Sequence, residues 1–299
     1  MAITSRDKTT KVKSISSINA YENNFVKVAA IQMASGPIVA ANLNEAERLI
    51  EVAANQGAKL VVLPEYFAIM GLKNTDKIKV REQEGTGEIQ RFLSKIAKKY
   101  KIWLIGGSIP LATQQAFKVR NSCLVYNDKG VQVARYDKIH LFGLDLGGEQ
   151  YNEAQTIEPG DEVVVVDTPF GKIGLSICYD LRFPELYRAM GEVDILVVPS
   201  AFTETTGKAH WETLVRARAV ENLCYMIAPA QGGYHLSGRE THGNSMIVDP
   251  WGAILDRLPR GSGVVVASIN KKYQVSLRKS LPALSHRVIN SSNKLTSKV

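Results

Sequence analysis

Short apolar runs and longer amphipathic segments follow one another along the chain from about residue 26 onward. Runs rich in β-branched residues and bounded by Gly, Pro, Asn or Asp are typical of buried strands. They predict strands over 26–33, 59–64, 102–109, 122–126, 131–137, 162–168, 172–177, 195–199, 224–228, 245–248, 253–257 and 264–269. Apolar residues spaced three and four apart predict helices over 42–56, 88–100 and 208–222, and a further helix begins near 183. Asn42 is expected to cap the first helix, with Glu45 completing a capping box.

The order of these elements indicates an α/β fold with mixed sheets. Helices alternate with strands early in the chain, whereas Asn127-Asp128-Lys129-Gly130 joins two strands and is a strong hairpin signal. About a dozen strands are too many for one simple doubly wound layer, so two packed sheets covered by helices are expected. No repeat, linker or low-complexity segment interrupts 27–270, which predicts a single domain.

The basic charge of the chain is concentrated at its two ends. The formal net charge is +8, of which +2 lies in 1–26 and +7 in 271–299, leaving −1 for the body between them. Basic tails alone are weak support for nucleic-acid binding, and no nucleic-acid partner is expected. Residues 1–25 are expected to form a disordered N-terminal tail, and 286–299 a basic C-terminal tail.

Composition favours a globular protein of the cytoplasm. Apolar residues make up 45% of the chain and charged residues 22%, which suits a sizeable core. No apolar run approaches the ~20 residues that span a membrane, and the N-terminus lacks an apolar signal-peptide core, so no membrane association is expected. Three cysteines cannot all pair internally, which favours a reducing compartment.

Cys178 stands between a predicted strand and a predicted helix. Residues 171–177 read as a buried strand, and Phe183-Pro184-Glu185 reads as a helix start because proline is tolerated in a first turn. Such a junction exposes a side chain, and backbone N–H groups freed there can receive negative charge. Cys178 is therefore a candidate nucleophile. The alternative is a buried thiol that only packs, the role assigned to Cys123 and Cys224 in their apolar runs.

Two further reactive side chains follow predicted strands. Glu65 ends Lys59-Leu-Val-Val-Leu-Pro-Glu, and Lys138 follows the strand that ends at Asp137. Either alone is more often a solvated surface charge. Together with Cys178 they place three reactive side chains at the ends of three predicted strands. In α/β sheets, ligand-binding and active sites form at such strand ends. The five histidines have no distinctive spacing to the cysteine, and no metal-binding, phosphate-loop or dinucleotide motif is present.

Three ordered motifs resemble the nitrilase superfamily of carbon–nitrogen hydrolases over about 27–285. They are Leu-Pro-Glu65-Tyr-Phe, Tyr-Asp-Lys138-Ile-His-Leu-Phe and Ser-Ile-Cys178-Tyr-Asp-Leu-Arg-Phe-Pro-Glu-Leu. The resemblance implies a four-layer αββα sandwich of two mixed β-sheets covered by helices, a Glu–Lys–Cys triad and no cofactor. It implies one hydrolase domain over 26–285 with a C-terminal arm from about 271, and a homodimer or higher homo-oligomer.

The resemblance also implies a role for each side chain. Glu65 would take the thiol proton and later activate water, while Lys138 and the backbone N–H of Tyr179 would stabilise the oxyanion. Glu153, in Tyr-Asn-Glu-Ala, matches the second glutamate that is usual near the lysine. The nucleophile would form a thioester and release ammonia from an amide.

Within the superfamily the chain is most similar to Nit-type amidases. These hydrolyse the terminal amide of small α-keto or ω-amide dicarboxylates, including deaminated glutathione. Arg182 is a candidate for binding a substrate carboxylate bidentately, and an ion pair with Glu185 is the alternative. Phe202 and Thr206 follow a strand end and are carried over as pocket residues. Many of these amidases read Leu-Phe-Asp where this chain reads Leu-Phe-Gly143, which removes a carboxylate from that stretch.

Other functions share parts of this pattern. An N-carbamoyl amino acid amidohydrolase or a nitrilase would carry the same triad. A catalytically inactive interaction protein is a weaker alternative, because all three triad residue types are present.

Overall fold

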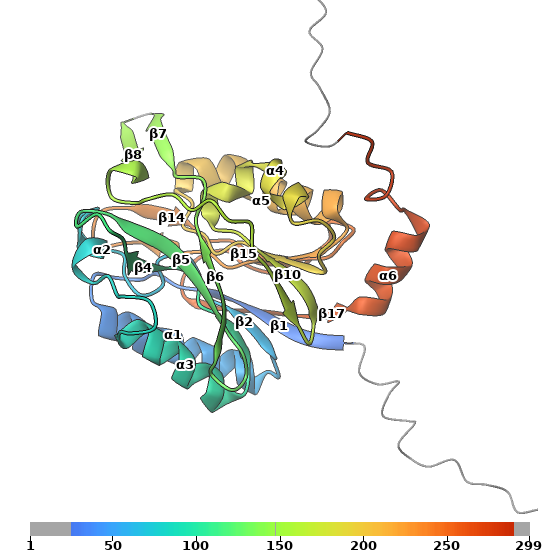
Figure 1. Ribbon diagram of the computed structural model, residues 1–299, viewed down its shortest axis with the longest axis horizontal. Coiled ribbons are helices and arrows are strands. Elements are labelled where there is room, and N and C mark those ends of the chain that lie inside the picture. The colour runs from blue at the N-terminus through green and yellow to red at the C-terminus, as the bar shows by residue number, and fades with distance from the viewer. Residues whose placement is uncertain (1–24, 147, 290–299) are drawn as a thin grey trace, which may run out of the picture.

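The structure is a computed structural model that describes residues 25–146 and 148–289 (Figure 1). The N-terminal tail predicted over 1–25 lies outside the described residues except for Phe25, and the C-terminal tail predicted over 286–299 is described only as far as 289. No helix in the described part is both long and apolar enough to cross a membrane.

One mixed sheet contains most strands of the first half of the chain together with the last strand. Its order is β17 (Gly263–Asn270), β1 (Phe25–Gln32), β2 (Leu60–Val62), β3 (Trp103–Ile105), β5 (Val119–Tyr126) and β4 (Ile109–Ala112), and β6 (Gln132–Asp137) also pairs with β5. Strands β1, β2 and β3 are parallel, and the other pairings are antiparallel. The expected hairpin at residues 127–130 joins β5 to β6.

The second mixed sheet comes from the second half of the chain. Its order is β16 (Ile254–Leu258), β15 (Ser245–Val248), β12 (Tyr225–Ala228), β11 (Ile195–Val197), β10 (Gly171–Leu175) and β9 (Val165–Thr168). Strands β10, β11 and β12 are parallel, and antiparallel strands flank them. Two short hairpins stand apart from both sheets: β7 (Gly143–Leu146) with β8 (Glu149–Asn152), and β13 (Gly232–Tyr234) with β14 (Glu240–His242).

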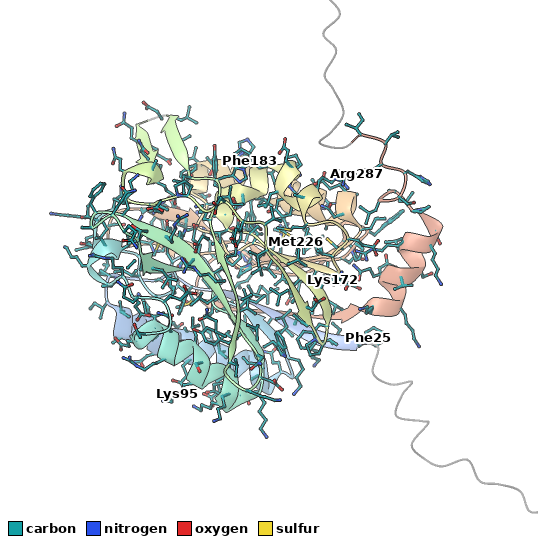
Figure 2. The ribbon with its side chains drawn as sticks, in the orientation of Figure 1. Phe25, Lys95, Lys172, Phe183, Met226 and Arg287 are labelled. Atoms are coloured by element: carbon teal, nitrogen blue, oxygen red, sulfur yellow. The ribbon has the colours of Figure 1, made fainter. Side chains whose placement is uncertain are left out.

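The side chains of β1 show how the layers are stacked. Val28 and Ala30 belong to the core that also contains the second sheet, whereas Ala29 and Ile31 pack with α1 (Val39–Asn55) and α3 (Glu88–Tyr100). On the far side α4 (Pro184–Ala189) and α5 (Glu204–Asn222) cover the second sheet (Figure 1). Met226 lies inside the molecule and Lys95 at its edge (Figure 2). The expected αββα sandwich is confirmed.

Several element boundaries differ from the sequence prediction. Helix α3 has the predicted bounds, but α1 begins three residues before Asn42. The Asn42 side chain does not cap the helix. It accepts from Gly36 N and donates to Ala68 O, at 2.8 and 2.9 Å, and so ties down the preceding loop. Helix α5 begins at Glu204, earlier than predicted, because the Thr203 hydroxyl caps it by accepting from Thr206 N.

Two other differences concern one divided strand and one additional helix. The apolar run 102–109 divides into β3 and β4, because the chain turns at Gly107 with φ +56°. Residues 271–280 form the helix α6 (Lys271–Ser280), which the sequence pattern did not indicate. The same stretch is the expected beginning of the C-terminal arm.

Candidate active site

The ends of three strands bring Glu65, Lys138 and Cys178 together. Glu65 comes three residues after β2, Lys138 directly after β6, and Cys178 opens the 3₁₀ helix η3 (Cys178–Arg182) that follows β10. The Lys138 Nζ lies 2.9 Å from Glu65 Oε1. Glu65 and Lys138 are each 1% exposed and Cys178 is 7% exposed, so neither charge is a solvated surface group.

Glu153 is the second carboxylate on Lys138. It opens the short 3₁₀ helix η2 (Glu153–Gln155), and its Oε2 lies 2.8 Å from Lys138 Nζ. Burial disfavours the ammonium, but Glu153 and Glu65 outweigh burial and hold the pKa of Lys138 well above its usual value. Burial likewise works against the Glu153 carboxylate, yet Lys138 and Lys77 bring its pKa down to about 2. Lys138 is therefore a fixed positive charge that can stabilise an anion.

Three polar side chains position the glutamates, and sequence reasoning did not identify them. Asn121 on β5 donates from Nδ2 to Glu65 Oε1 at 2.9 Å. Gln231 donates to the Glu65 backbone carbonyl, and the Tyr66 hydroxyl donates to Glu153 Oε1 at 2.8 Å. Tyr66 stands inside the Leu-Pro-Glu-Tyr-Phe motif, which is the one sequence signal that pointed to it.

Cys178 occupies a strained elbow. Its φ of +48° lies in the left-handed region, which costs a non-glycine residue roughly 1–3 kcal/mol and persists only where the surroundings enforce it. The Cys178 N–H donates to Pro199 O at 2.9 Å. Burial raises the pKa of the Cys178 thiol well above its usual value, the Glu65 carboxylate adds to the rise, and Lys138 offsets only part of it. At neutral pH the thiol is protonated, so its attack on a carbonyl requires a base.

Asp180 connects the cysteine elbow to the segment that carries Lys138. Its fully buried carboxylate accepts from Ile177 N at 2.9 Å, Tyr136 Oη at 2.7 Å and His140 N at 3.0 Å. The ring Nδ1 of His140 also lies 2.7 Å from it. Because Tyr136 and His140 stand two residues on either side of Lys138, this one carboxylate fixes the lysine segment relative to the elbow.

A small pocket opens onto Cys178. It is narrow, with a free volume of only about 10 Å³. Its lining contains all four residues predicted to bind substrate, and the full set is Phe142, Cys178, Tyr179, Arg182, Ala201, Phe202, Thr203 and Thr206. Pockets for drug-sized ligands measure ~300–1,000 Å³, so this pocket as it stands is far smaller than such a site.

Arg182 forms one wall of this pocket with aromatic neighbours. Its guanidinium carbon lies 5.8 Å from the Tyr179 ring centroid and 5.5 Å from that of Phe202. Its Nη2 is 3.3 Å from His210 Nδ1. Among the described residues it makes no ion pair with Glu185 or any other carboxylate, so its charge is available to an anionic ligand.

Two other features bear on the sequence analysis. Gly143 is exposed at the start of β7 and is not part of the pocket lining. In the described part of the chain, no three His, Cys, Asp or Glu side chains are grouped so that they could hold a metal ion.

Comparison with known proteins places this chain in a family. The model of the carbon-nitrogen hydrolase family matches residues 27–279. The chain belongs to the carbon–nitrogen hydrolases. This confirms the enzyme class and the superfamily that the three motifs indicated.

Relatives of this carbon–nitrogen hydrolase have amidase names. The deaminated glutathione amidase of Synechocystis sp. is 43% identical over 266 residues, covering 87% of this chain and 97% of the relative. The omega-amidase NIT2 of Danio rerio is 36% identical, with coverages of 87% and 94%. Among solved structures, Nit3 of Saccharomyces cerevisiae, a member of branch 10 of the nitrilase superfamily, superposes with a TM-score of 0.79 at 33% identity, covering 86% of this chain and 94% of Nit3.

Proposed function

We propose that this hydrolase cleaves the terminal amide of a small carboxylate-bearing substrate through a thioester on Cys178. The observation that carries the proposal is the buried contact of Glu65 with Lys138 beside a protonated thiol. The wall of the adjacent pocket contains Arg182, which makes no ion pair among the described residues. The names of the relatives support deaminated glutathione or an α-keto ω-amide as the substrate class.

The first half of the reaction forms the thioester. Glu65 takes the proton from the Cys178 thiol as the sulfur attacks the amide carbon. The negative charge that develops on the carbonyl oxygen is stabilised by the Lys138 ammonium and by the backbone N–H of Tyr179, which follows the nucleophile in the 3₁₀ turn. Glu65 returns the proton to the leaving nitrogen, and ammonia departs from a primary amide.

The second half of the reaction hydrolyses the thioester. The Glu65 carboxylate removes a proton from a water molecule that attacks the acyl carbon, and the same cation stabilises the second oxyanion. The carboxylic acid leaves as the proton passes to the sulfur. Glu153 does not exchange protons in this scheme. It holds Lys138 in place and keeps it charged, which its low pKa and its hydrogen bonds from Tyr66 and Phe142 N support.

Arg182 gives the pocket its preference for an anionic substrate. A guanidinium binds a carboxylate through two parallel hydrogen bonds, and aromatic neighbours hold this one in place. Phe202 and Thr206 complete the wall. We infer that a carboxylate close to the scissile amide binds Arg182, and that a neutral amide of the same length is a poorer substrate.

Two enzyme classes of the same superfamily remain candidates. An N-carbamoyl amino acid amidohydrolase and a nitrilase would use the same Glu65, Lys138 and Cys178. The relatives' names favour the amidase. The arginine does not separate it from the carbamoyl enzyme, because an N-carbamoyl amino acid also carries a carboxylate. A catalytically inactive interaction protein is disfavoured, because the site retains a nucleophile, a base and an oxyanion-stabilising charge.

Substrate profiling tests this function. Purified protein is incubated with ω-amides of dicarboxylates, N-carbamoyl amino acids and nitriles, and both the nitrogen product and the acid are quantified. The amides with a nearby carboxylate should be hydrolysed fastest, and Cys178→Ala should be inactive on all of them. Preferential hydrolysis of carbamoyl compounds or nitriles would replace the amidase proposal with the corresponding alternative.

We also propose that the protein is a cytoplasmic homodimer or higher homo-oligomer. All three cysteines are buried and unpaired, which is compatible with a reducing compartment. The proposed arm that begins with α6 exposes the apolar side chains Tyr273, Val275 and Leu281. Light scattering coupled to size-exclusion chromatography tests the oligomeric state, and a monomer at micromolar concentration would contradict it.

A further inference from the structure

One wall of the pocket on Cys178 is made by the start of α5 and the residues just before it. Phe202, Thr203 and Thr206 line the pocket from this stretch. The ring centroid of Phe202 lies 5.5 Å from the guanidinium carbon of Arg182. Contacts that fix the position of this stretch therefore also fix the wall against which Arg182 packs.

Strand β14 holds part of this wall through its backbone. The His242 N–H donates to Phe202 O at 3.0 Å, and Thr203 forms an antiparallel bridge with Thr241. Both contacts lie before Glu204, the first residue of α5. They place the wall beside β14 but do not contact the first turn of the helix.

The side chain of His242 reaches that first turn. Its Nδ1 lies 3.0 Å from Glu204 Oε2, and its ring packs against Gly207. A Cβ on Gly207 would lie 2.3 Å from the Cβ of His242 and 2.4 Å from its Cγ, closer than two carbon atoms can approach. The close packing of this ring on α5 therefore requires a glycine at 207.

Asn244 determines which nitrogen of the His242 ring carries the proton. The Nδ2 of Asn244 lies 3.0 Å from the backbone carbonyl of His242 and 3.1 Å from its Nε2. A carbonyl oxygen only accepts, so the Asn244 nitrogen is the donor in both contacts and the ring Nε2 accepts. The imidazole proton is then on Nδ1, which donates to Glu204.

Glu204 receives a second donor from another segment. The Nη2 of Arg260 lies 3.1 Å from the same oxygen, Oε2. Burial works against the Glu204 carboxylate, but the hydrogen bond from His242 and the charge of Arg260 hold its pKa below the usual value. A carboxylate in the first turn also suits the helix dipole. Glu204 is thus a charged anchor for the pocket wall, oriented by His242.

We propose that Glu204 and His242 are positioning residues that set the preference of the pocket for an anionic acyl group. Their contact holds the first turn of α5, so that Phe202 and Thr206 keep the wall in the place where Arg182 can bind a carboxylate. Neither residue lines the pocket, so both act through the wall. This inference rests on the proposed function.

Two amides of equal length measure this preference. The anionic amide is the monoamide of a five-carbon dicarboxylate, and the neutral amide has a methyl group in place of the carboxylate. In Glu204→Ala and in His242→Ala, the ratio of kcat/KM for the anionic amide to that for the neutral amide should fall by about 10-fold, mainly through the KM of the anionic amide. The kcat should change by less than about threefold, because Glu65, Lys138 and Cys178 are retained.

Three further variants test whether one contact is responsible. Glu204→Gln keeps an oxygen that can accept from His242 Nδ1, so it should retain most of the wild-type ratio. Gly207→Ala keeps both side chains but places a methyl group against the His242 ring, so its ratio should fall as in Glu204→Ala. Glu204→Ala combined with His242→Ala should lower the ratio no further than either change alone, because both remove the same contact.

Glu212 provides the matched control. It is a glutamate on the same helix, it pairs with Arg257 on β16, and it does not line the pocket. Glu212→Ala should leave the ratio as in wild type. If Glu204→Ala and His242→Ala slow both amides equally, or if Glu212→Ala lowers the ratio as much as they do, the two residues are structural and the proposal is wrong.

Calorimetry makes the test independent of catalysis. In the Cys178→Ala background, Glu204→Ala should weaken binding of the anionic amide by about 10-fold and leave binding of the neutral amide unchanged. If the wild type hydrolyses neither amide while this selective loss of binding is observed, the proposed function is wrong and the positioning role stands. If the wild type hydrolyses the anionic amide but its binding does not depend on Glu204, the positioning role is wrong and the proposed function stands.

Discussion

Replacing Asp180 with Asn tests whether one buried carboxylate holds the active site together. The two oxygens of Asp180 each accept from a backbone N–H, Ile177 N on one side and His140 N on the other. An asparagine side chain has only one acceptor oxygen. In either orientation of its amide, one of the two backbone N–H groups therefore faces an NH₂ group and loses its acceptor. An unsatisfied buried donor costs about 1–3 kcal/mol, and each lost charge-assisted hydrogen bond adds about 1.5–3 kcal/mol.

The free energy of unfolding of Asp180→Asn should therefore fall by about 3–5 kcal/mol, as expected for breaking a buried charged network. Native proteins are stable by roughly 5–15 kcal/mol, so the variant remains largely folded at 25 °C. Its kcat should fall by about 100-fold, because a misplacement of about 1 Å between catalytic groups has that effect. Urea unfolding and steady-state amide hydrolysis measure the two quantities on the same preparation.

Tyr136→Phe is the control for this prediction. It removes the hydroxyl that donates to Asp180 Oδ2 but retains the carboxylate and both backbone contacts. The free energy of unfolding should fall by about 1.5–3 kcal/mol, less than for Asp180→Asn, with a small change in kcat. If Asp180→Asn lost stability as predicted but kept a kcat within threefold of wild type, the carboxylate would not be what aligns Cys178 with Lys138.

Two further predictions concern the charges of the site. Glu153→Gln should lower kcat by about 100- to 1,000-fold with little change in KM, because the substitution loosens the lysine that stabilises the oxyanion. A change confined to KM would contradict that role of Glu153. Alkylation of Cys178 by iodoacetamide can be followed by peptide mass spectrometry. The reaction should be slow at pH 7 and accelerate beyond pH 8.5, because burial raises the pKa of the thiol. An alkylation rate that has already reached its plateau at pH 7 would contradict this prediction.

The sequence was most informative where one local pattern determines the structure. The amphipathic spacing of 88–100 predicted α3 with its observed bounds, because one apolar face must lie on the sheet. The apolar strands before Glu65, Lys138 and Cys178 were recognisable for the same reason. Ordered motifs then joined the three side chains into one expected site, before any distance between them was known.

The rest of the site depends on contacts between residues far apart in the chain. Asp180 meets Tyr136 across 44 positions, and Asn121 meets Glu65 across 56, and no periodicity encodes either pairing. The hairpin β7–β8 consists of short, mostly exposed strands, so it lacks the alternating apolar pattern that marks a buried strand.

The helix boundaries that differed have local causes. Asparagine is a favoured helix-capping residue, but the side chain of Asn42 forms hydrogen bonds with the backbone of Gly36 and Ala68. Helix α1 begins without this cap. Helix α6 is largely basic and polar, and Gln274 is its one buried residue. The sequence therefore lacks the apolar stripe from which a helix could be predicted.

Trapping the acyl-enzyme tests the central claim most directly. Wild-type protein is mixed with the preferred amide, quenched with acid during turnover and analysed by intact-mass and peptide mass spectrometry. The account predicts an adduct with the mass of the acyl group on the peptide that contains Cys178, and in Cys178→Ala it predicts neither adduct nor product. An acyl group on another residue, or wild-type turnover by Cys178→Ala, would contradict it.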